Sequence, residues 1–463
     1  MKYAPPPLRT LTVTVAILVS LAPSLLPRPP IMQGIVTGLL AALAYALAVL
    51  AGRVLVAIRN TPEREPRESA QVLALLFSAI AVSWAVVATD HWQDGLRLSM
   101  GMPTIGPSHW AQATVCGALT FLVLFGAGNG LGRLARRVGR PGAVTAIVVG
   151  VVGAQVIGPA AAAMLSESYS ESNSVIEASV DRPLATERDG GAAVRWETLG
   201  REGRRFVAAG DRSPAIRTYV GLNSADDTNT RAALAVSELD RAGGFDKSAV
   251  VVAVPTGSGW IDASAASGIE QRFGGDVAIV GLQYSFAPSW VTFLFARDAA
   301  DESATALLSA VTEHVSGMPT DRRPDIYVYG QSLGSVGGSA ALADSDARAS
   351  VCGILWAGPP AGSVDTRGAT VLANTSDPVV WWSPKLITTP PDLDSADRDA
   401  PIPAWLPGIS FVQTSVDLLT ALSVPPGHGH RYGTEQGTAL PECEAQEGEL
   451  IGPRAASYAA PTR

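Results

Sequence analysis

Apolar residues crowd into the first third of the chain, in stretches separated by polar segments. The stretches cover residues 10–26, 33–52, 70–89, 111–130 and 142–165. A helix needs about 20 apolar residues to cross a bilayer core, and none of these stretches contains a charged side chain. Buried helices of a soluble core would keep a polar face, and these lack one. The pattern predicts an all-α transmembrane bundle of about five helices over residues 1–166.

The first stretch, 10–26, is the shortest and also fits the core of a signal peptide. It has no A-x-A cleavage site, and further apolar stretches follow it. A cleaved signal peptide would be expected to have such a site. We therefore predict that it is retained as the first helix.

Arginines are unevenly distributed among the connecting segments. Two segments are rich in them, with Arg53, Arg59, Arg64 and Arg67 after the second stretch and Arg133, Arg136, Arg137 and Arg140 after the fourth. The alternate segments hold only Arg28 and Arg97. Positive residues stay on the cytoplasmic side of a membrane. The distribution predicts a cytoplasmic N-terminus, five crossings, and an extracytoplasmic domain after residue 166.

The pattern changes after the last apolar stretch. Residues 167–193 are small and polar, as in a linker. Short apolar runs rich in β-formers then appear at 249–255, 277–284, 325–330, 353–359 and 370–375, and helical segments lie between them at 230–243 and 301–315. Such runs are typical of strands buried on both faces. Residues 194–463 are therefore predicted to form an α/β domain with a mostly parallel sheet and helices on both faces.

Composition narrows the function classes. Of the 463 residues 47% are hydrophobic and 16% charged, and the net charge of −8 gives no basic surface for nucleic acid. The three cysteines form no CxxC or Cys/His cluster, so a zinc site is not supported. No metal or organic cofactor is expected. An oxidising exterior would permit a disulfide between Cys352 and Cys443, leaving Cys116 within a span.

The candidate nucleophile is Ser332, in Gly330-Gln331-Ser332-Leu333-Gly334. The motif G-x-S-x-G carries meaning when it follows a strand and precedes a helix. Here IYVY precedes it and a run of small residues follows. In such a turn the glycines avoid clashes and the serine hydroxyl stands above the sheet edge. The other interpretation is a glycine-rich turn with an idle serine.

A serine hydroxyl needs a base and an acid, which in this arrangement follow it in the order acid, then histidine. Asp377 comes directly after the last predicted strand and before a proline, with Asp365 and Asp417 as weaker rivals. The histidines after the serine are His428 and His430, both in PPGHGHRYG. They alternate along an extended loop, and the sequence leaves open which one is the base.

Negative charge on the substrate would need hydrogen-bond donors. One is the backbone N–H of Leu333, and the other is expected from Thr256 and Gly257, where VVVAVPTGSGW leaves a strand. Two aromatic clusters remain open between core packing and a lid for an acyl chain. They are Trp290, Phe293, Leu294 and Phe295 beside Pro288, and WWSP at 381–384.

At these positions the chain resembles the actinobacterial-type membrane-anchored α/β-hydrolases, which join a multi-span N-terminal domain to a C-terminal catalytic domain. The resemblance rests on APSLLPR (22–28), RTYVGLNSA (217–225), VPTGSGW (254–260), YSFAPSWVTFL (284–294), YGQSLGS (329–335), LANTSDPVVWW (372–382) and PPGHGHRYG (425–433). It covers nearly the whole chain. It implies Ser332 as nucleophile, Asp377 as acid and a histidine of the GHGH loop as base.

The sequence thus predicts a membrane-anchored serine hydrolase acting on an ester of a lipid or cell-envelope component. One alternative is an acyltransferase that uses the same acyl-enzyme. Another is a non-catalytic membrane scaffold on a hydrolase fold. The absence of charge within the predicted spans argues against an ion or substrate pathway.

Overall fold

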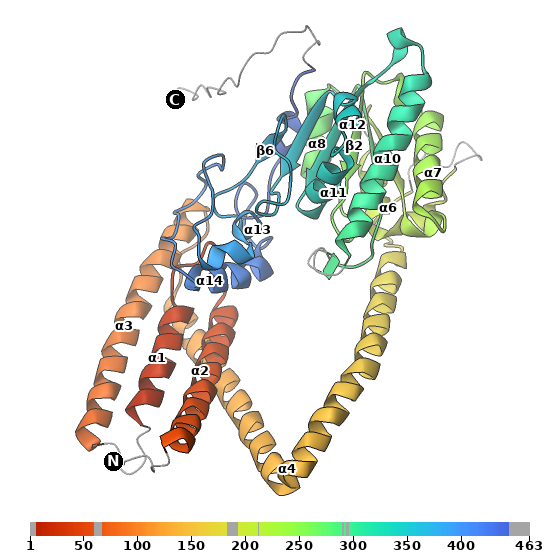
Figure 1. Ribbon diagram of the computed structural model, residues 1–463. Coiled ribbons are helices and arrows are strands. Elements are labelled where there is room, and N and C mark those ends of the chain that lie inside the picture. Colours follow the sequence, from red (N-terminus) through yellow and green to blue (C-terminus); the bar gives the residue numbers. More distant parts are fainter. Residues whose placement is uncertain are drawn as a thin grey trace, which may run out of the picture.

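The structure is a computed structural model, and it describes residues 6–59, 67–182, 193–211, 213–288, 291–292 and 296–443. Within 131–166 it describes the backbone and a few of the side chains. The described chain forms an N-terminal helical region (residues 6–182) and an α/β domain (Figure 1). The helices of the first part are α1 (Pro7–Ser20), α2 (Pro30–Arg59), α3 (Glu68–Ser99) and α4 (Pro107–Ser174).

Three segments of the helical region are long and apolar enough to cross a membrane. They are Pro30–Ile58, Glu68–Ser99 and Pro107–Gly130, which contain the predicted stretches 33–52, 70–89 and 111–130. Helix α1 is shorter, with 14 residues. It ends at Ser20 and not near residue 26, because Pro23 and Pro27 interrupt the helical hydrogen-bond ladder. Residues 21–29 instead form a loop, termed the α1–α2 loop.

Helix α4 differs from the prediction, because the fourth and fifth stretches and the arginines between them form one helix of 68 residues. Figure 1 shows it as two arms that meet at an angle. Pro141 lies in this helix, and a proline inside a helix bends it. The helix also continues to Ser174, into the predicted linker 167–193.

Helices α2 and α4 pack closely through small residues. A Cβ atom added at Gly34 would lie 2.6 Å from the carbonyl oxygen of Ala113, and one at Gly38 would lie 2.4 Å from that of Gly117. Gly34 and Gly38 form a G-x-x-x-G motif, which lets helix backbones approach each other in a membrane.

The α/β domain contains a parallel sheet in the order β1-β3-β2-β4-β5-β6. The strands are β1 (Ile216–Val220), β2 (Ala249–Val254), β3 (Val277–Leu282), β4 (Asp325–Gln331), β5 (Gly353–Ala357) and β6 (Thr370–Leu372). Strands β2 to β6 match the five predicted runs, and β2 and β3 are buried at every position. The prediction missed β1.

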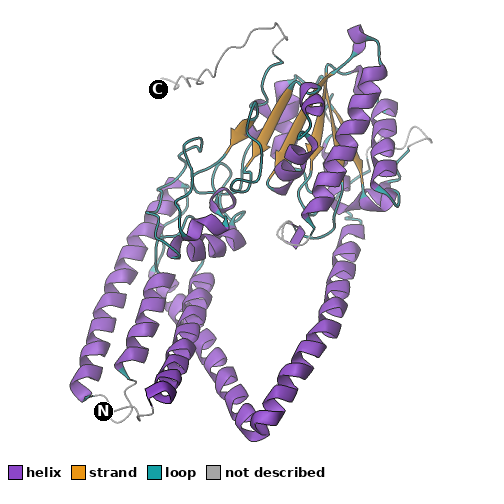
Figure 2. Ribbon diagram, in the orientation of Figure 1, coloured by secondary structure: helices purple, strands orange, loops and turns teal. Residues whose placement is uncertain are grey.

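Helices cover both faces of this sheet (Figures 1 and 2). On one face α10 packs on α7 and α11, and on the other α8 packs on α15. The helices of the domain are α6 (Gly200–Ala209), α7 (Thr228–Arg241), α8 (Ala263–Arg272), α10 (Arg297–Gly317), α11 (Leu333–Ala341), α12 (Ser345–Ala349) and α15 (Glu435–Thr438). The predicted α/β domain with helices on both faces is confirmed.

The strand order reverses at one position along the carboxyl edge of the sheet. After β3 the chain crosses back over β2 to form β4 on its other side. Ligands of such sheets bind where the strand order reverses, outside the carboxyl ends of the strands. That position lies between the loops that follow β2 and β4.

A segment at residues 378–427, termed the bridging segment, joins the two parts of the molecule. It contains α13 (Pro378–Trp381), η5 (Pro384–Ile387), α14 (Ile409–Asp417) and η6 (Leu418–Thr420), and Figure 1 shows α14 at the ends of α1 and α2. This segment shares a second hydrophobic core with the helical region, built from Leu25, Leu26, Leu96, Met100, Trp381, Leu386, Ala400 and Val424. Trp381, from the predicted WWSP cluster, is therefore a core residue.

Candidate active site

Ser332 stands in a sharp turn between β4 and α11. Its φ of 52° and ψ of −122° are unusual for a residue with a side chain, and among the described residues Ser332 is the only non-glycine with positive φ. Such strain persists only where the surroundings hold it, and it is concentrated at functional sites. The predicted strand–serine–helix context is present.

The flanking glycines are required by space. A Cβ atom at Gly330 would lie 2.5 Å from the carbonyl oxygen of Gly334, and one at Gly334 would lie 2.2 Å from that of Val254. The turn therefore presses against the end of β2. Gln331, between Gly330 and Ser332, is buried, and its amide atoms have no hydrogen-bond partner among the described residues.

The turn is tied to the next strand, β5. The backbone N–H of Ser332 donates to the carbonyl oxygen of Ala357, at 2.9 Å. Gly358 follows with a φ of 53°. A Cβ atom there would lie 2.7 Å from Cε1 of His430 and 2.8 Å from Oδ2 of Asp377. Gly358 thus leaves room for a histidine and a carboxylate beside the strand end that holds Ser332.

Asp377 and His430 form a buried pair. Nδ1 of His430 lies 2.7 Å from Oδ2 of Asp377, and their side chains are 9% and 0% exposed. The other carboxylate oxygen accepts the backbone N–H of Val379 at 2.8 Å, so Asp377 also caps α13. A carboxylate at Nδ1 favours the tautomer whose Nε2 accepts a proton. The pair can therefore act as an oriented base.

Tyr432 completes this pair. Its hydroxyl donates to Oδ2 of Asp377 at 2.7 Å. Burial first, and then the charge of Asp377, raise the pKa of Tyr432 well above its ordinary value, so the phenol stays protonated. The hydroxyl of Tyr432 therefore remains a hydrogen-bond donor to Asp377 whether His430 is neutral or protonated.

The second histidine of the loop has a different partner. Nδ1 of His428 lies 3.1 Å from Oδ2 of Asp399. Asp399 also accepts from the hydroxyl of Thr375 at 3.0 Å and from the N–H and hydroxyl of Ser376. The structure thus brings His430, and not His428, to Asp377.

The rival acids are engaged elsewhere. Asp365 pairs with Arg367 at 2.8 Å, and the hydrogen bond from this arginine is the main reason that the pKa of Asp365 is lowered. Asp417 pairs with Arg28 in the helical region at 2.7 Å. Neither rival has a histidine as its partner among the ion pairs of the described residues.

The loop after β2, with Thr256 and Gly257, lies against the start of α11. The Cβ position of Gly334 is 3.0 Å from the carbonyl oxygen of Pro255. However, the N–H of Thr256 donates to the carbonyl oxygen of Trp260 at 2.9 Å, inside its own turn. This bond engages the backbone N–H of Thr256 within its own turn. Leu333, Thr256 and Gly257 stay predictions as the residues that would stabilise an oxyanion.

Side chains from β1 and from the segment that follows β3 hold this loop in place. Tyr219 donates to the carbonyl oxygen of Gly259 at 2.7 Å, and Tyr284 donates to that of Pro255 at 3.0 Å. The amide nitrogen of Gln283 lies 3.2 Å from the carbonyl oxygen of Ser258 and 3.1 Å from the side-chain oxygen of Asn173, at the end of α4. The loop is therefore preorganised for donors that must stay in place.

The other predicted aromatic cluster cannot be placed. Trp290, Phe293, Leu294 and Phe295 lie outside the described residues. Of the second cluster, Trp382 donates from its ring nitrogen to the hydroxyl of Ser415 at 2.9 Å. With Trp381 in the core, WWSP serves to pack the bridging segment.

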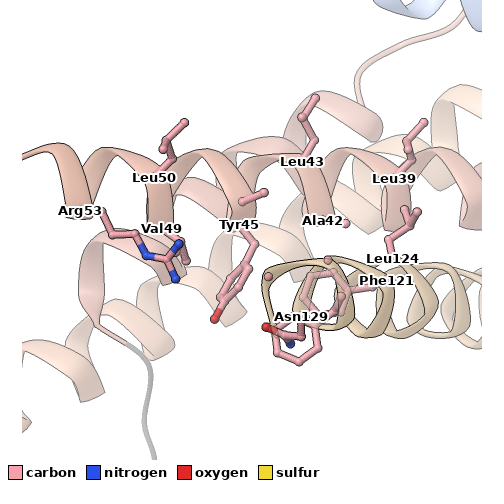
Figure 3. A pocket seen from close by; sticks show the side chains of 14 residues that line it. Leu39, Ala42, Leu43, Tyr45, Val49, Leu50, Arg53, Phe121, Leu124 and Asn129 are labelled. Carbon is pink, nitrogen blue, oxygen red and sulfur yellow. The ribbon is translucent and has the colours of Figure 1, made fainter. Parts of the chain in front are cut away.

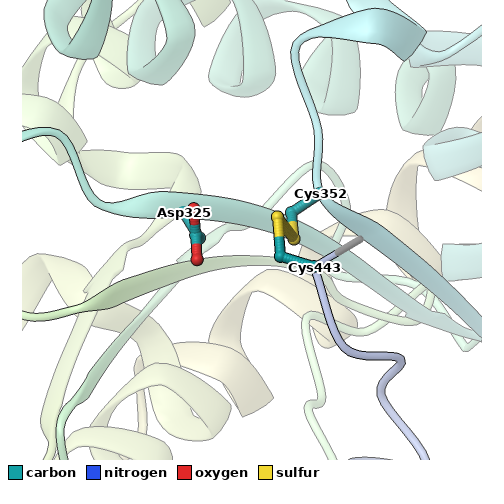
Figure 4. A group of neighbouring side chains, drawn as sticks. All are labelled: Asp325, Cys352 and Cys443. Atoms are coloured by element: carbon teal, nitrogen blue, oxygen red, sulfur yellow. A yellow bond between two sulfur atoms is a disulfide. The ribbon is translucent and has the colours of Figure 1, made fainter. Parts of the chain in front are cut away.

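Cys352 and Cys443 are joined by a disulfide beside Asp325 (Figure 4). These three residues form the group of possible metal ligands found among the described residues. Both sulfurs are committed to the disulfide, and a metal would need thiolates. The group is therefore a covalent link between β5 and the C-terminal segment.

A cavity of about 850 Å³ lies far from Ser332, between α2 and α4 (Figure 3). Its lining is mostly apolar, with Tyr45, Arg53 and Asn129 as its polar side chains. The described residues that line it include no serine, histidine or carboxylate. This cavity therefore lacks the groups that could form a serine–histidine–acid site.

Sequence reasoning missed three residues of the site. Tyr432 lies in the quoted PPGHGHRYG motif and Gly358 follows a predicted strand, so both carried a local signal. Asp399 lies in the polar stretch SADRDAP, which carries none. Asp399 can be recognised only in the folded chain, where it accepts hydrogen bonds from Ser376 and lies beside His428.

Comparison with family models agrees with the observed fold. The model of an alpha/beta-hydrolase family matches residues 216–371 and 365–448, and the model of the N-terminus of an alpha/beta-hydrolase family matches residues 21–210. The comparisons with curated proteins and with solved structures gave no match. Since the matches cover most of both parts of the molecule, the chain belongs to this alpha/beta-hydrolase family.

Proposed function

We propose that the protein is a membrane-anchored serine hydrolase that cleaves an ester of a lipid or cell-envelope component. The observation that carries the proposal is the buried Asp377–His430 pair beside the strained Ser332 turn. A nucleophile, a base and a group that orients the base are the parts that acyl transfer to serine requires.

In the first half of the reaction the Ser332 hydroxyl attacks the ester carbonyl. Nε2 of His430 takes the hydroxyl proton, and Asp377 stabilises the imidazolium through Nδ1. The tetrahedral oxyanion is stabilised by the N–H of Leu333, at the start of α11, and by a donor of the Thr256–Gly257 segment. The C–O bond then breaks, and His430 gives its proton to the leaving alcohol.

In the second half a water molecule attacks the acyl-enzyme. His430 takes a proton from that water, and the new tetrahedral intermediate forms at the same donors. Its collapse returns the proton to Oγ of Ser332 and releases the carboxylic acid. An alcohol in place of water would give acyl transfer by the same steps.

Three observations support an extracytoplasmic site near the membrane surface. Disulfides such as Cys352–Cys443 persist in oxidising compartments, and the arginine-rich segments favour a cytoplasmic N-terminus. Leu419 and Leu422 are 71% and 52% exposed, close to Asp417, which contacts the α1–α2 loop. Exposed leucines at this level suit an ester carried by a lipid or held in the envelope.

The test is labelling by a fluorophosphonate in membranes that contain the full-length protein. Wild type should label, Ser332→Ala should not, and Ser339→Ala, on the same helix α11, should label like wild type. Failure of folded wild type to label would overturn the proposal in favour of a non-catalytic scaffold.

Product analysis then separates hydrolysis from transfer. The protein is given a p-nitrophenyl ester with and without a long-chain alcohol as acceptor. We expect free acid as the main product in both cases. A new ester as the main product would instead identify an acyltransferase.

A further inference from the structure

The α1–α2 loop of the helical region forms a buried ion pair with the bridging segment. Nη2 of Arg28 lies 2.7 Å from Oδ1 of Asp417, and their side chains are 3% and 1% exposed. The two residues are 389 positions apart in the chain. An ion pair that is exposed to water contributes little to stability. The burial of this pair therefore sets it apart from a surface contact between two independent parts of the chain.

Further hydrogen bonds hold the same contact. Oδ2 of Asp417 accepts the backbone N–H of Leu25 at 2.8 Å, and the side-chain amide of Gln413 donates to the carbonyl oxygen of Val19. The N–H of Arg28 donates to the side chain of Gln93 on α3 at 2.7 Å. The loop is thus fixed both to its own bundle and to α14.

The contact continues to the histidine. Four residues after Asp417, the carbonyl oxygen of Ala421 accepts the backbone N–H of His430 at 3.0 Å. A Cβ atom at Gly429 would lie 3.2 Å from Cδ2 of Leu26 and 2.8 Å from Cγ2 of Val424. Leu26 is fully buried, so the loop that carries His430 rests on a side chain of the helical region.

We infer that the α1–α2 loop is a structural part of the active site, in which Arg28 and Leu26 are positioning residues for His430. This inference rests on the proposed function. Arg28 fixes Asp417, Asp417 and its helix fix Ala421, and Ala421 and Leu26 fix the backbone of Gly429 and His430. The helical region therefore contributes to the geometry of the base as well as to anchoring.

The charge on Asp417 depends on this contact. Burial is the main influence on Asp417 and raises the pKa of its carboxyl group, while Arg28 and the N–H groups of Leu25 and Leu26 act in the opposite direction. Without Arg28 the carboxyl group would tend to take up a proton. The segment from Asp417 to His430 would then lose the ion pair that holds it to the α1–α2 loop.

The experiment compares variants of the full-length protein in membranes or detergent. Arg28→Gln and Arg28→Lys change the ion pair, and Leu26→Ala removes the support beneath Gly429. The matched controls are Arg217→Gln, which breaks the Arg217–Glu270 pair between β1 and α8, and Leu96→Ala, which empties the same core from α3. The readouts are the fluorophosphonate labelling rate, kcat and KM for a p-nitrophenyl ester, and hydrogen exchange over residues 421–432.

We expect Arg28→Gln and Leu26→Ala to slow labelling by about tenfold or more, since small misplacements of a catalytic group are costly. The loss should appear in kcat and not in KM, exchange over 421–432 should rise, and Arg28→Lys should recover part of the rate. Both controls should label within about twofold of wild type.

Two results would overturn the inference. If wild type labels at Ser332 and Arg28→Gln and Leu26→Ala label as fast as their controls, His430 does not depend on the helical region, and the proposed function stands. If wild type does not label at all, the proposed function fails and this inference fails with it.

Discussion

Two aspartate–histidine pairs lie side by side at the end of this chain, and they differ in what surrounds them. His430 pairs with Asp377, next to Gly358 and the strand end that holds Ser332. His428, two residues earlier, pairs with Asp399, and its side chain is 19% exposed. The same residue types thus form one pair beside the strand end that holds Ser332 and another that is built into a turn.

The partners of each carboxylate explain the difference. Asp377 accepts from His430, Tyr432 and one backbone N–H, so its bonds are directed at the base. Asp399 accepts mostly from Thr375 and Ser376, and Ser376 in turn accepts the N–H of Gly429. The first pair orients the imidazole of His430, whereas the second links the Thr375–Ser376 turn to the histidine loop.

The largest effect that would sharpen this comparison is at the histidines themselves. His430→Ala should slow fluorophosphonate labelling and ester hydrolysis by about 10³-fold or more, because the base is lost. His428→Ala should slow them by less than about fivefold, which is what the loss of one hydrogen bond costs. Equal losses in the two variants would break the assignment of His430 as the base.

Substitution of the two carboxylates should affect different quantities, the rate for Asp377 and the stability of the fold for Asp399. Asp377→Asn should lower kcat by about 10³-fold with a small change in thermal midpoint, since asparagine still caps α13. Asp399→Asn should lower the free energy of unfolding by about 1–3 kcal/mol, because buried donors of Ser376 and Thr375 lose a charged acceptor. Initial rates and thermal unfolding in detergent measure the two quantities. The comparison fails if Asp399→Asn is the slower enzyme.

Gly358 offers a steric way to disturb the Asp377–His430 pair alone. Gly358→Ala places a methyl group against His430 and Asp377 at a position with positive φ. We expect kcat to fall by about 10²-fold from misplacement of the base. Gly362→Ala, which also has positive φ but open space around it, is the control for backbone strain. Similar losses in both variants would attribute the effect to strain.

The smallest expected effect concerns the phenol that supports Asp377. Tyr432→Phe should slow hydrolysis by about two- to tenfold, since one hydrogen bond to the carboxylate is lost. Tyr329→Phe removes a comparable buried bond, from the Tyr329 hydroxyl to Gln436 at 2.6 Å, away from the histidine. It should affect stability and leave kcat unchanged. A rate loss in Tyr329→Phe equal to that in Tyr432→Phe would remove the special role of Tyr432.

Much of the fold could be predicted from local patterns, and the exceptions have physical reasons. Strands β2 to β6 are continuous apolar runs, which identify them without tertiary information. Strand β1, IRTYV, was missed because Arg217 interrupts its apolar pattern. That arginine is buried and pairs with Glu270 of α8 at 2.6 Å, and this partner is 53 residues distant in the chain.

The candidate site shows the same division. The order of serine, acid and histidine selected Ser332, Asp377 and two histidines, but alternation along a loop does not say which histidine faces which carboxylate. The partner of His430 is 53 residues away, and that of His428 is 29 residues away. Their encounters depend on where β6 ends and how the bridging segment folds back.

The sequence by itself determined the apolar stretches of the helical region, the strand runs and the glycine-bounded turn at Ser332. These features depend on periodicity, helix length and steric limits among near neighbours. Only the tertiary structure decided that His430 is the partner of Asp377, that Leu26 lies against Gly429 and that Arg28 pairs with Asp417. The last of these contacts joins residues 389 positions apart, and the geometry of all three is set by the packing of all the elements between them.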